Sequence, residues 1–407
     1  MQLGGVSFGG CFVGSLGFAV ADRKELEFTY SLIDRVFRLS LGELADFSGA
    51  KYDGDLSLSL EEAQRRKHEY VAERIGIGPG RRVLDLGCGW GPLLNFVRES
   101  GGEGVGVTLS SAQVKSCRCH GLDVHLMDVR EVGRDTFGRV DAVASLGAFE
   151  HFCSPQDYRA GRQDEVYRDV FARAASVLPD GGRVYLQTMV FGRNMIPIEA
   201  VSIEAPRDSD AWYLALMQHQ FPGSFLPFGA GQVIRAAEPY FRLVESSSGR
   251  LDYIETIKQW RARFANRSLR KTVMKARLVP RYLTSRDFRL AFTSGVSANS
   301  VCFERELLDH FRLVFEKRHT EPSGWRDSSP TTEAFAGYDV TNRAPARRAL
   351  SCGPSAPFRH EPAGMSPAAR APRPRASASR TSSRPTTTVS GPAGRPGMRR
   401  APAAGCS

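Results

Sequence analysis

The sequence lacks the paired cysteines that would hold a metal ion. Its 8 cysteines are scattered over 407 residues, and the close pair Cys117 and Cys119 has no second pair to complete a zinc site. No metal centre is therefore predicted. Scattered cysteines without such a framework are typical of a reduced protein, so we expect a cytoplasmic location.

Lysine is absent after Lys317, although the chain as a whole is basic. Residues 318–407 hold 14 arginines and 5 acidic residues, so nine of the eleven net positive charges lie there. The rest of the chain carries only about +2, which does not indicate a face for nucleic acid. Because it is poor in apolar residues, 318–407 is predicted to be a disordered tail, either a cationic tether or a dispensable extension.

Charged residues are also missing from residues 3–21, a run formally long enough to cross a bilayer. Six of these residues are glycine, and no lysine or arginine precedes them as it would in a signal peptide. We therefore predict that residues 1–24 form a poorly ordered extension.

Helical spacing of apolar residues marks two stretches, 25–47 and 59–75. Ser59 is a candidate N-cap of the second stretch, and Glu62 completes a capping box with it. Together they predict an N-terminal helical segment over residues 25–75.

From residue 76 onward, short apolar runs alternate with helical patterns, which is typical of an α/β Rossmann-like fold with a parallel sheet and helices on both faces. We expect residues 76–317 to form this domain, with an inserted cap at about 190–285. The predicted elements are strands at 82–86, 104–108, 124–127, 142–145 and 183–188, helices at 92–99 and about 255–285, and a final helix and strand within 303–316.

A glycine cluster, Asp85-Leu-Gly87-Cys-Gly89-Trp-Gly91, joins the first strand to its helix. Glycines let the backbone approach a ligand closely, and a helix N-terminus offers free N–H groups to an anion. Dinucleotide sites and methyl-donor sites share this geometry. The second strand ends in Gly106-Val-Thr-Leu-Ser110 rather than in the acidic residue that binds the ribose of NAD, which disfavours a dehydrogenase.

Several motifs together resemble the cyclopropane-fatty-acid synthase and mycolic-acid methyltransferase family. They are the glycine cluster, Gly106-Val-Thr-Leu-Ser110 with Gln113, Gly147-Ala-Phe-Glu-His-Phe152, Phe221-Pro-Gly with Leu226-Pro227, and Ser59-Leu-Glu-Glu-Ala-Gln64 with Lys67. The match runs from about residue 47 to 317. It implies a class I methyltransferase fold and transfer of a methyl group from S-adenosylmethionine to a cis double bond of an acyl chain.

The same resemblance implies a cofactor site. The residues around the methionine half would be Gly87, Cys88, Gly89, Trp90 and Gly91. Those at the ribose would be Thr108, Leu109 and Gln113, and those at the adenine Asp128 and Val129. Ser48 and Asp85 would also belong to the cofactor site.

At the reaction centre, the family is thought to use a bicarbonate base held by Cys, Glu, His and Tyr. Glu150 and Tyr253 match two of these positions, whereas Gly49 stands in place of the Cys and Gln187 in place of the His. Asn299 falls at a further Cys position of the family. These departures put bicarbonate and ordinary ring closure in question. We name Glu150, Tyr253, Gln187 and His151 as candidate catalytic residues, with His219 as a possible substitute imidazole.

The resemblance implies an unsaturated acyl lipid or acyl carrier as partner, with no nucleic acid and an undetermined oligomeric state. Peripheral contact at the inner membrane surface would use a basic face, and an aromatic cluster would either line an acyl channel or form the core of the cap. The basic residues are Arg261, Arg263, Arg267, Arg270, Lys271 and Lys275; the apolar cluster is Phe191, Met195, Trp212, Tyr213, Phe221, Phe225 and Phe228.

Two alternatives stay open on the sequence alone. One is a methyltransferase of the same fold that acts on a small N, O or C nucleophile, for which the missing bicarbonate ligands would be no handicap. The other is a cofactor-binding protein without catalysis.

Overall fold

The computed structural model describes residues 41, 45–221, 223–266, 269–284, 289 and 298–319. The predicted extension at 1–24, most of the predicted helix at 25–47 and the predicted tail beyond His319 lie outside the described residues.

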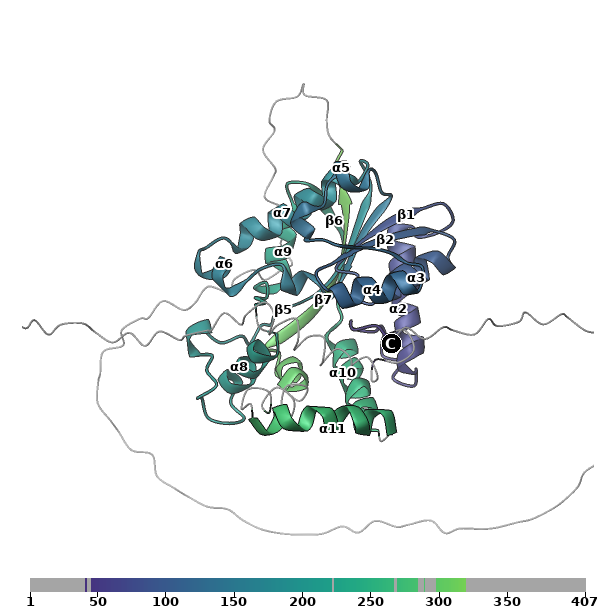
Figure 1. Cartoon of the computed structure of the whole chain (residues 1–407). Helices are drawn as coiled ribbons and strands as arrows, with labels where there is room; N and C mark the ends of the chain where they lie inside the picture. Colours follow the sequence, from purple (N-terminus) through teal and green to yellow (C-terminus); the bar gives the residue numbers. More distant parts are fainter. Residues whose placement is uncertain are drawn as a thin grey trace, which may run out of the picture. The chain divides into compact units, whose positions relative to one another are not determined.

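A seven-stranded sheet with the order β3-β2-β1-β4-β5-β7-β6 forms the centre of the described fold (Figure 1). The strands are β1 (Arg82–Leu86), β2 (Glu103–Thr108), β3 (Asp123–Leu126), β4 (Ala142–Leu146), β5 (Arg183–Phe191), β6 (Phe241–Ser248) and β7 (Leu308–Lys317). All six predicted strands are confirmed, the last of them as β7, and β5 runs three residues further than predicted.

The sheet is parallel as predicted except at one strand. β7 pairs antiparallel with both β5 and β6. The chain re-enters the sheet at the carboxyl end of β5, where Leu308 lies opposite Phe191, so β7 can only run backwards between its neighbours. β6 itself was not predicted, because its second half is a polar run at the edge of the sheet and buries little apolar surface.

Helices cover both faces of the sheet, as predicted. Along β4, Ala142 and Ala144 join the core with α2 and α3, while Val143 between them joins the core with α7. This alternation follows from the two-residue period of a strand. The covering helices are α2 (Leu60–Ile75), α3 (Pro92–Glu99), α4 (Ser111–Cys119), α5 (Arg134–Phe137), α6 (Pro155–Arg159), α7 (Gln163–Val177) and α9 (Gly229–Ala237).

The capping box predicted for α2 is confirmed. The Ser59 hydroxyl accepts a hydrogen bond from the Glu62 backbone N–H, and the Glu62 carboxylate accepts one from the Ser59 N–H at 2.8 Å. Such caps stabilise a helix by about 1 kcal/mol. α2 thereby has a defined start directly before the residues that it contributes to the site.

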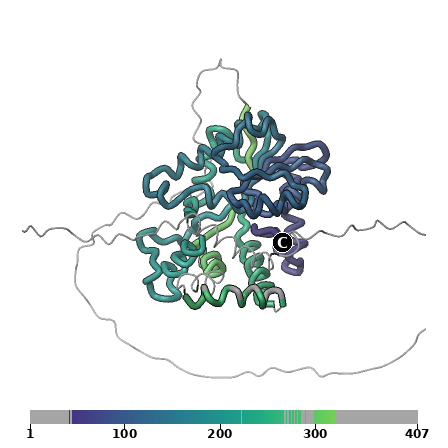
Figure 2. Tube along the Cα trace, viewed as in Figure 1, coloured from purple at the N-terminus to yellow at the C-terminus, as the bar shows by residue number. Residues whose placement is uncertain are grey.

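Three further helices lie beyond the carboxyl end of β5 (Figures 1 and 2). They are α8 (Asp210–Gln220), α10 (Arg250–Ala265) and α11 (Leu269–Thr284). The single basic helix predicted over 255–285 is therefore two helices. Short 3-10 turns complete the described elements: η1 (Val129–Glu131), η2 (Phe149–His151) and η3 (Ile198–Ala200).

Candidate active site

The glycine loop between β1 and α3 has the backbone geometry of a ligand-binding turn. Gly87, Gly89 and Gly91 have φ values of +86°, +55° and +79°, a region that favours glycine. A Cβ on Gly87 would lie 2.2 Å from the Ala148 Cβ, so packing alone requires this glycine. A Cβ on Gly89 would meet no atom of the described residues within 4 Å. The open space therefore lies at the middle glycine.

The start of α3 is available to an anion. Gly91 is its N-cap and supplies no side-chain hydrogen bond, and Pro92 occupies the first turn. The N–H groups that follow therefore keep their donor capacity for a ligand, and the helix dipole favours a carboxylate there. Cys88 is buried below the loop, where its sulfur would lie 2.6 Å from a Cβ on Gly106. Trp90 is partly exposed in the loop itself.

The next two strands bring the predicted ribose and adenine residues to the same edge of the sheet. The Thr108 hydroxyl donates to the Gln113 Oε1 at 2.6 Å, and Leu109 is exposed between them in the chain. Asp128 pairs with the Arg130 guanidinium at 2.6 Å, and this hydrogen bond lowers the pKa of the carboxyl. Val129 is buried beside it.

A buried polar network holds Ser48 against this edge. The Ser48 hydroxyl donates to Asp46 at 2.7 Å, Lys67 donates to that hydroxyl at 2.7 Å, and Gln64 donates to the Ser48 carbonyl at 2.8 Å. Lys67 also pairs with Asp46. Sequence reasoning matched Lys67 to a family motif but did not identify Asp46, because its partner lies 21 residues away.

Asp85, at the end of β1, is a buried carboxyl whose Oδ1 has no hydrogen-bond partner among the described residues. Burial, reinforced by the charge of Asp46 and opposed by that of Lys67, raises the pKa of Asp85 to about 7.

A small pocket with a cavity volume of about 20 Å³ opens next to Ser48. It brings together three of the four predicted catalytic residues, Glu150, His151 and Tyr253. The lining residues are Phe47, Ser48, Gly49, Gly147, Glu150, His151, Met189, Phe221, Tyr253 and His310. The pocket is thus mostly apolar and aromatic, with a few polar groups.

Glu150 is the acidic residue of this pocket. It lies on η2, directly after β4, and its Oε1 accepts a hydrogen bond from the Met189 N–H at 2.8 Å. Its Oε2 has no partner among the described residues. Because the carboxyl is buried, its pKa is raised to about 7. The neighbouring His151 is exposed, and its Nδ1 lies 2.6 Å from the Ser224 hydroxyl.

Tyr253 enters the pocket from α10. Its ring stacks on His310 with a centroid distance of 4.9 Å and an interplanar angle of 8°. Asn299 hydrogen-bonds the Tyr253 hydroxyl, while burial and the charge of Glu150 raise the pKa of that hydroxyl. The phenol is therefore neutral and serves as a hydrogen-bonding group.

Gln187 does not line the pocket, unlike the other three predicted catalytic residues. It is fully buried on β5, where its Nε2 donates to the Gly49 carbonyl at 2.9 Å and its Oε1 accepts from the Tyr185 hydroxyl at 3.2 Å. Both ends of the amide are thus used, and they hold the Gly49 backbone in place.

His310 is the pocket residue that sequence reasoning missed. It lies on β7, opposite Met189 of β5, and only 2% of it is exposed. The one available signal was the presence of a histidine within the last predicted strand. His219, which the sequence suggested as a substitute imidazole, is exposed on α8 and is not part of the pocket lining.

The aromatic cluster predicted near the substrate is divided by the structure. Phe221 lines the pocket. Phe191, Phe225 and Phe228 instead pack on one another and on Tyr158, with Tyr158 and Phe225 stacked at 4.0 Å. These three residues therefore form a packing cluster and do not line the pocket.

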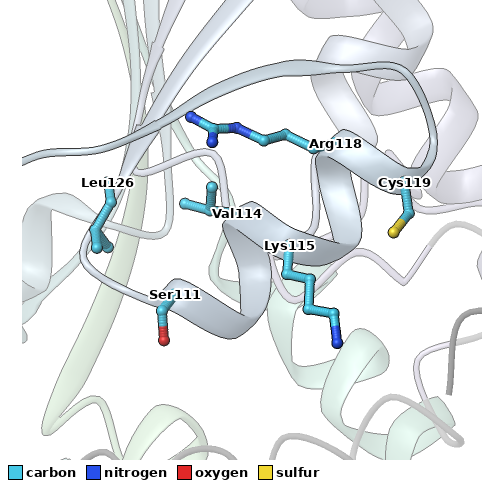
Figure 3. Close-up of a pocket in the computed structure, with 6 residues that line it drawn as sticks. All are labelled: Ser111, Val114, Lys115, Arg118, Cys119 and Leu126. Carbon is cyan, nitrogen blue, oxygen red and sulfur yellow. The ribbon is translucent and has the colours of Figure 1, made fainter.

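A larger and more open groove lies on the outer side of α4 (Figure 3), with a volume of about 570 Å³. Its lining contains none of the predicted site residues. The residues are Ser111, Val114, Lys115, Arg118, Cys119 and Leu126.

Comparison with known families gives a match over residues 19–290 to the model described as mycolic acid cyclopropane synthetase. This match covers more than half of the chain. The chain belongs to this family of S-adenosylmethionine-dependent methyltransferases. The resemblance drawn from the sequence motifs is thereby confirmed.

Similar curated proteins carry related names. Cyclopropane mycolic acid synthase 2 of Mycobacterium leprae is 31% identical over 206 residues, covering 49% of this chain and 65% of the relative. Cyclopropane-fatty-acyl-phospholipid synthase of Escherichia coli is 30% identical over 292 residues, covering 71% of this chain and 66% of the relative. The chain thus spans slightly less than two thirds of the length of either relative.

Solved structures support the fold. The mycolic acid cyclopropane synthase CmaA1 complexed with SAH and CTAB, and the cyclopropane synthase MmaA2 from Mycobacterium tuberculosis, each align with a TM-score of 0.56 at 24% identity. In both cases the alignment covers 71% of this chain and 95% of the other. The predicted class I Rossmann-like methyltransferase fold is confirmed.

The described residues lack two kinds of feature. Those residues contain no cluster of three or more His, Cys, Asp or Glu side chains that could hold a metal ion. They also contain no helix long and apolar enough to span a membrane.

Proposed function

We propose that this protein transfers a methyl group from S-adenosylmethionine to the double bond of an unsaturated acyl chain, carried by a phospholipid or an acyl carrier. The observation that supports this most directly is Glu150, a buried carboxylate with one oxygen free of partners among the described residues, in a pocket lined mainly by apolar and aromatic groups.

The chain's own residues fit the cofactor. Gly89 leaves room for a ligand, the start of α3 offers donors to a carboxylate, and Gln113 and Asp128 stand at the adjacent strand ends. When bound, S-adenosylmethionine supplies an electrophilic methyl group, to which the π electron pair of the double bond forms a new C–C bond while the S–C pair stays on sulfur.

The pocket residues suit the charge that alkylation creates. The acyl chain becomes a carbocation, which water would capture, so aromatic walls such as Phe47 and Phe221 protect it by excluding water. An ionised Glu150 stabilises the positive charge across a low-dielectric pocket. The Tyr253 hydroxyl hydrogen-bonds Asn299 and adds a neutral polar group to the pocket.

A bicarbonate base fits this pocket poorly. Gly49 offers no thiol, and the Gln187 amide is used by Gly49 and Tyr185. We therefore assign no step to bicarbonate, and the proton acceptor must be sought among the chain's own groups.

Contact with a membrane surface is supported by α11. Its sequence carries five basic residues and no acidic one, and it leaves four apolar side chains exposed: Leu269, Val273, Val279 and Leu283. A basic helix with exposed apolar residues suits an anionic lipid surface. Among the basic residues predicted for this contact, Arg263 instead pairs with Glu61, and Lys275 lies over the Phe264 ring. The side chains of Arg267, Arg270 and Lys271 lie outside the described residues.

The deciding experiment is mass spectrometry of total lipids from a host that expresses the protein and is fed methyl-labelled methionine. Acyl chains that gain one labelled carbon are expected, and their remaining unsaturation identifies the product as ring, branch or methylene. If no labelled lipid is found although cofactor binding is demonstrated, the methyl acceptor is instead a small molecule with an N, O or C nucleophile.

The loop assignment has its own test. Gly89→Val is expected to abolish binding of S-adenosylmethionine, measured by calorimetry, because the side chain would fill the space left at the middle glycine. Gly80→Val is the matched control, since Gly80 also has a left-handed φ of +71° and open space around it. Equal affinity in the two variants would refute the loop as the cofactor site.

A further inference from the structure

His310 is a buried imidazole in the lining of the reaction pocket. It lies within β7, with its ring parallel to Tyr253 and in the lining of the same pocket as Glu150. Every other described residue of the pocket comes from the segment before α2, the loops after β4 and α8, β5 or α10. His310 is thus the contribution of β7 to the pocket.

Two glycines make room for this ring. A Cβ on Gly49 would lie 3.2 Å from both the His310 Cε1 and Nε2, and 2.6 Å from the Tyr253 Cδ2. A Cβ on Gly249 would lie 2.4 Å from the His310 Nδ1. Side chains at either position would displace the imidazole. The chain therefore lacks a Cβ on both sides of His310, and the Nε2 edge faces the Gly49 wall of the pocket.

The proposed reaction requires a proton acceptor at this place. An alkylated acyl chain bears a carbocation, and it must lose a proton to give a ring, a methylene or a branched alkene. Tyr253 is a neutral phenol and is therefore a poor proton acceptor. The amide of Gln187 is already hydrogen-bonded to the Gly49 carbonyl and the Tyr185 hydroxyl. The His151 Nδ1 lies 2.6 Å from the Ser224 hydroxyl, which occupies that nitrogen. Among the described pocket side chains, Glu150 and His310 each keep a buried polar atom without a hydrogen-bond partner.

The two remaining groups differ in their charge at neutral pH. Burial and the charges of Arg312 and Lys67 hold the pKa of His310 well below its usual value. The ring is therefore uncharged and one nitrogen has a free lone pair. A proton next to a carbocation is strongly acidic, so even a weak base suffices to remove it. Glu150 is then kept as the anion that stabilises the cation.

We propose that His310 is the proton acceptor of the reaction pocket. The C–H bond next to the cation breaks, its electron pair forms the ring bond or the new double bond, and the proton is taken by the lone pair of the neutral imidazole. This inference rests on the proposed alkylation of acyl chains. It restores an imidazole to a pocket in which position 187 supplies none.

The test uses the full chain with His310→Phe and His310→Gln. The phenylalanine variant keeps an aromatic ring between Gly49 and Gly249 and on Tyr253 but removes both nitrogens, and the glutamine variant keeps a polar group. His120→Gln, an exposed imidazole at the end of α4, is the matched control. Thermal melting and cofactor affinity establish that each variant is folded and loaded.

Product analysis separates proton transfer from packing. Loss of the acceptor is expected to lower turnover about 100-fold or more, with cofactor affinity unchanged. It should also raise the fraction of labelled chains captured by water as a methyl-branched alcohol, because the cation persists. His120→Gln should retain both rate and product ratio.

Several results would overturn the inference. One is full turnover in either folded variant; another is reduced turnover with an unchanged product ratio, which would make His310 a packing residue. If the unaltered protein labels no lipid, the proposed function itself fails, and this inference fails with it. If His310→Phe melts at a lower temperature than the parent and His310→Gln does not, the turnover and product ratio of His310→Gln decide whether the inference holds.

Discussion

Gly49 is the residue on which the geometry of the pocket depends most directly. An added Cβ would clash with Tyr253 at 2.6 Å, and Tyr253 cannot move away because it is stacked on His310 and edge-packed against Phe303 at 4.9 Å. Gly49→Ala is therefore expected to lower the free energy of unfolding by about 1–3 kcal/mol, as overpacking does, measured by denaturant titration.

The matched control for that variant is Gly78→Ala. A Cβ there meets no atom of the described residues within 4 Å, and its φ is not left-handed. We expect stability within about 0.5 kcal/mol of the parent. If Gly49→Ala and Gly78→Ala are equally stable, the Tyr253 and His310 rings can shift to accommodate the added Cβ at a lower cost than their packing indicates.

Glu150 gives a prediction about pH. Its pKa is raised to about 7, so the carboxylate form that stabilises a cation increases as the pH rises through 7. Glu150→Gln should bind S-adenosylmethionine normally but turn over slowly. The ratio of parent to variant turnover, at saturating cofactor, should grow between pH 6 and 8. Asp85 titrates near the same pH in both proteins, so its contribution cancels in the ratio.

A ratio that stays constant with pH would contradict this role for the ionised carboxylate. Retained turnover in Glu150→Gln would reduce Glu150 to a structural acceptor for the Met189 N–H.

At the level of residues, the sequence indicated most of the pocket but not His310. Glu150 and Tyr253 could be named because each lies in a motif that is contiguous or spaced like the family's. His310 could not, because its approach to Gly49 depends on the register between β5 and β7 and spans 261 residues of chain. Gln187 was named from its position, yet hydrogen bonds with Tyr185 and with the distant Gly49 occupy its amide, and it does not line the pocket.

Among the elements, α11 offers the clearest test of the proposed membrane contact. Replacing Leu269 and Leu283 together by Glu should weaken binding to vesicles that contain anionic phospholipid, because it removes apolar area and adds like charge to the lipid surface. Sedimentation with vesicles at low and physiological salt measures the effect, and binding by the parent should fall with salt.

Val244→Glu serves as the control for the helix variant. Val244 is an exposed apolar residue on β6, at the edge of the sheet, and its replacement should leave vesicle binding unchanged. If the helix variant binds as tightly as the parent, α11 is not the lipid-facing element.

Element prediction succeeded where the periodicity was strong and local. β1, α3 and the capped start of α2 follow from runs and caps within a few residues. β6 was missed because an edge strand needs only half of its side chains to be apolar, and Glu245 to Ser248 are all polar. The break between α10 and α11 was missed because the basic pattern continues across it.

For the whole molecule, the essential boundary is the end of β7. A chain ending after His319 keeps the Arg318 N–H bond to the Tyr240 carbonyl and the whole of β7. We expect it to melt cooperatively and to bind S-adenosylmethionine as the full chain does, measured by calorimetry. A chain ending at Leu307 loses β7 and should show no cooperative transition. Loss of melting in the longer truncation would show that later residues belong to the fold.

The place of β7 in the sheet also concerns the chain during its synthesis. The strand follows every other described strand in the sequence, yet it lies between β5 and β6. Until the ribosome has delivered residues 308–317, the nascent chain carries two unpaired strand edges, which are prone to pair with other chains. Holdase chaperones that shield such edges should therefore be needed most in that interval. The step that closes the sheet is also the step in which β7 brings His310 into the reaction pocket.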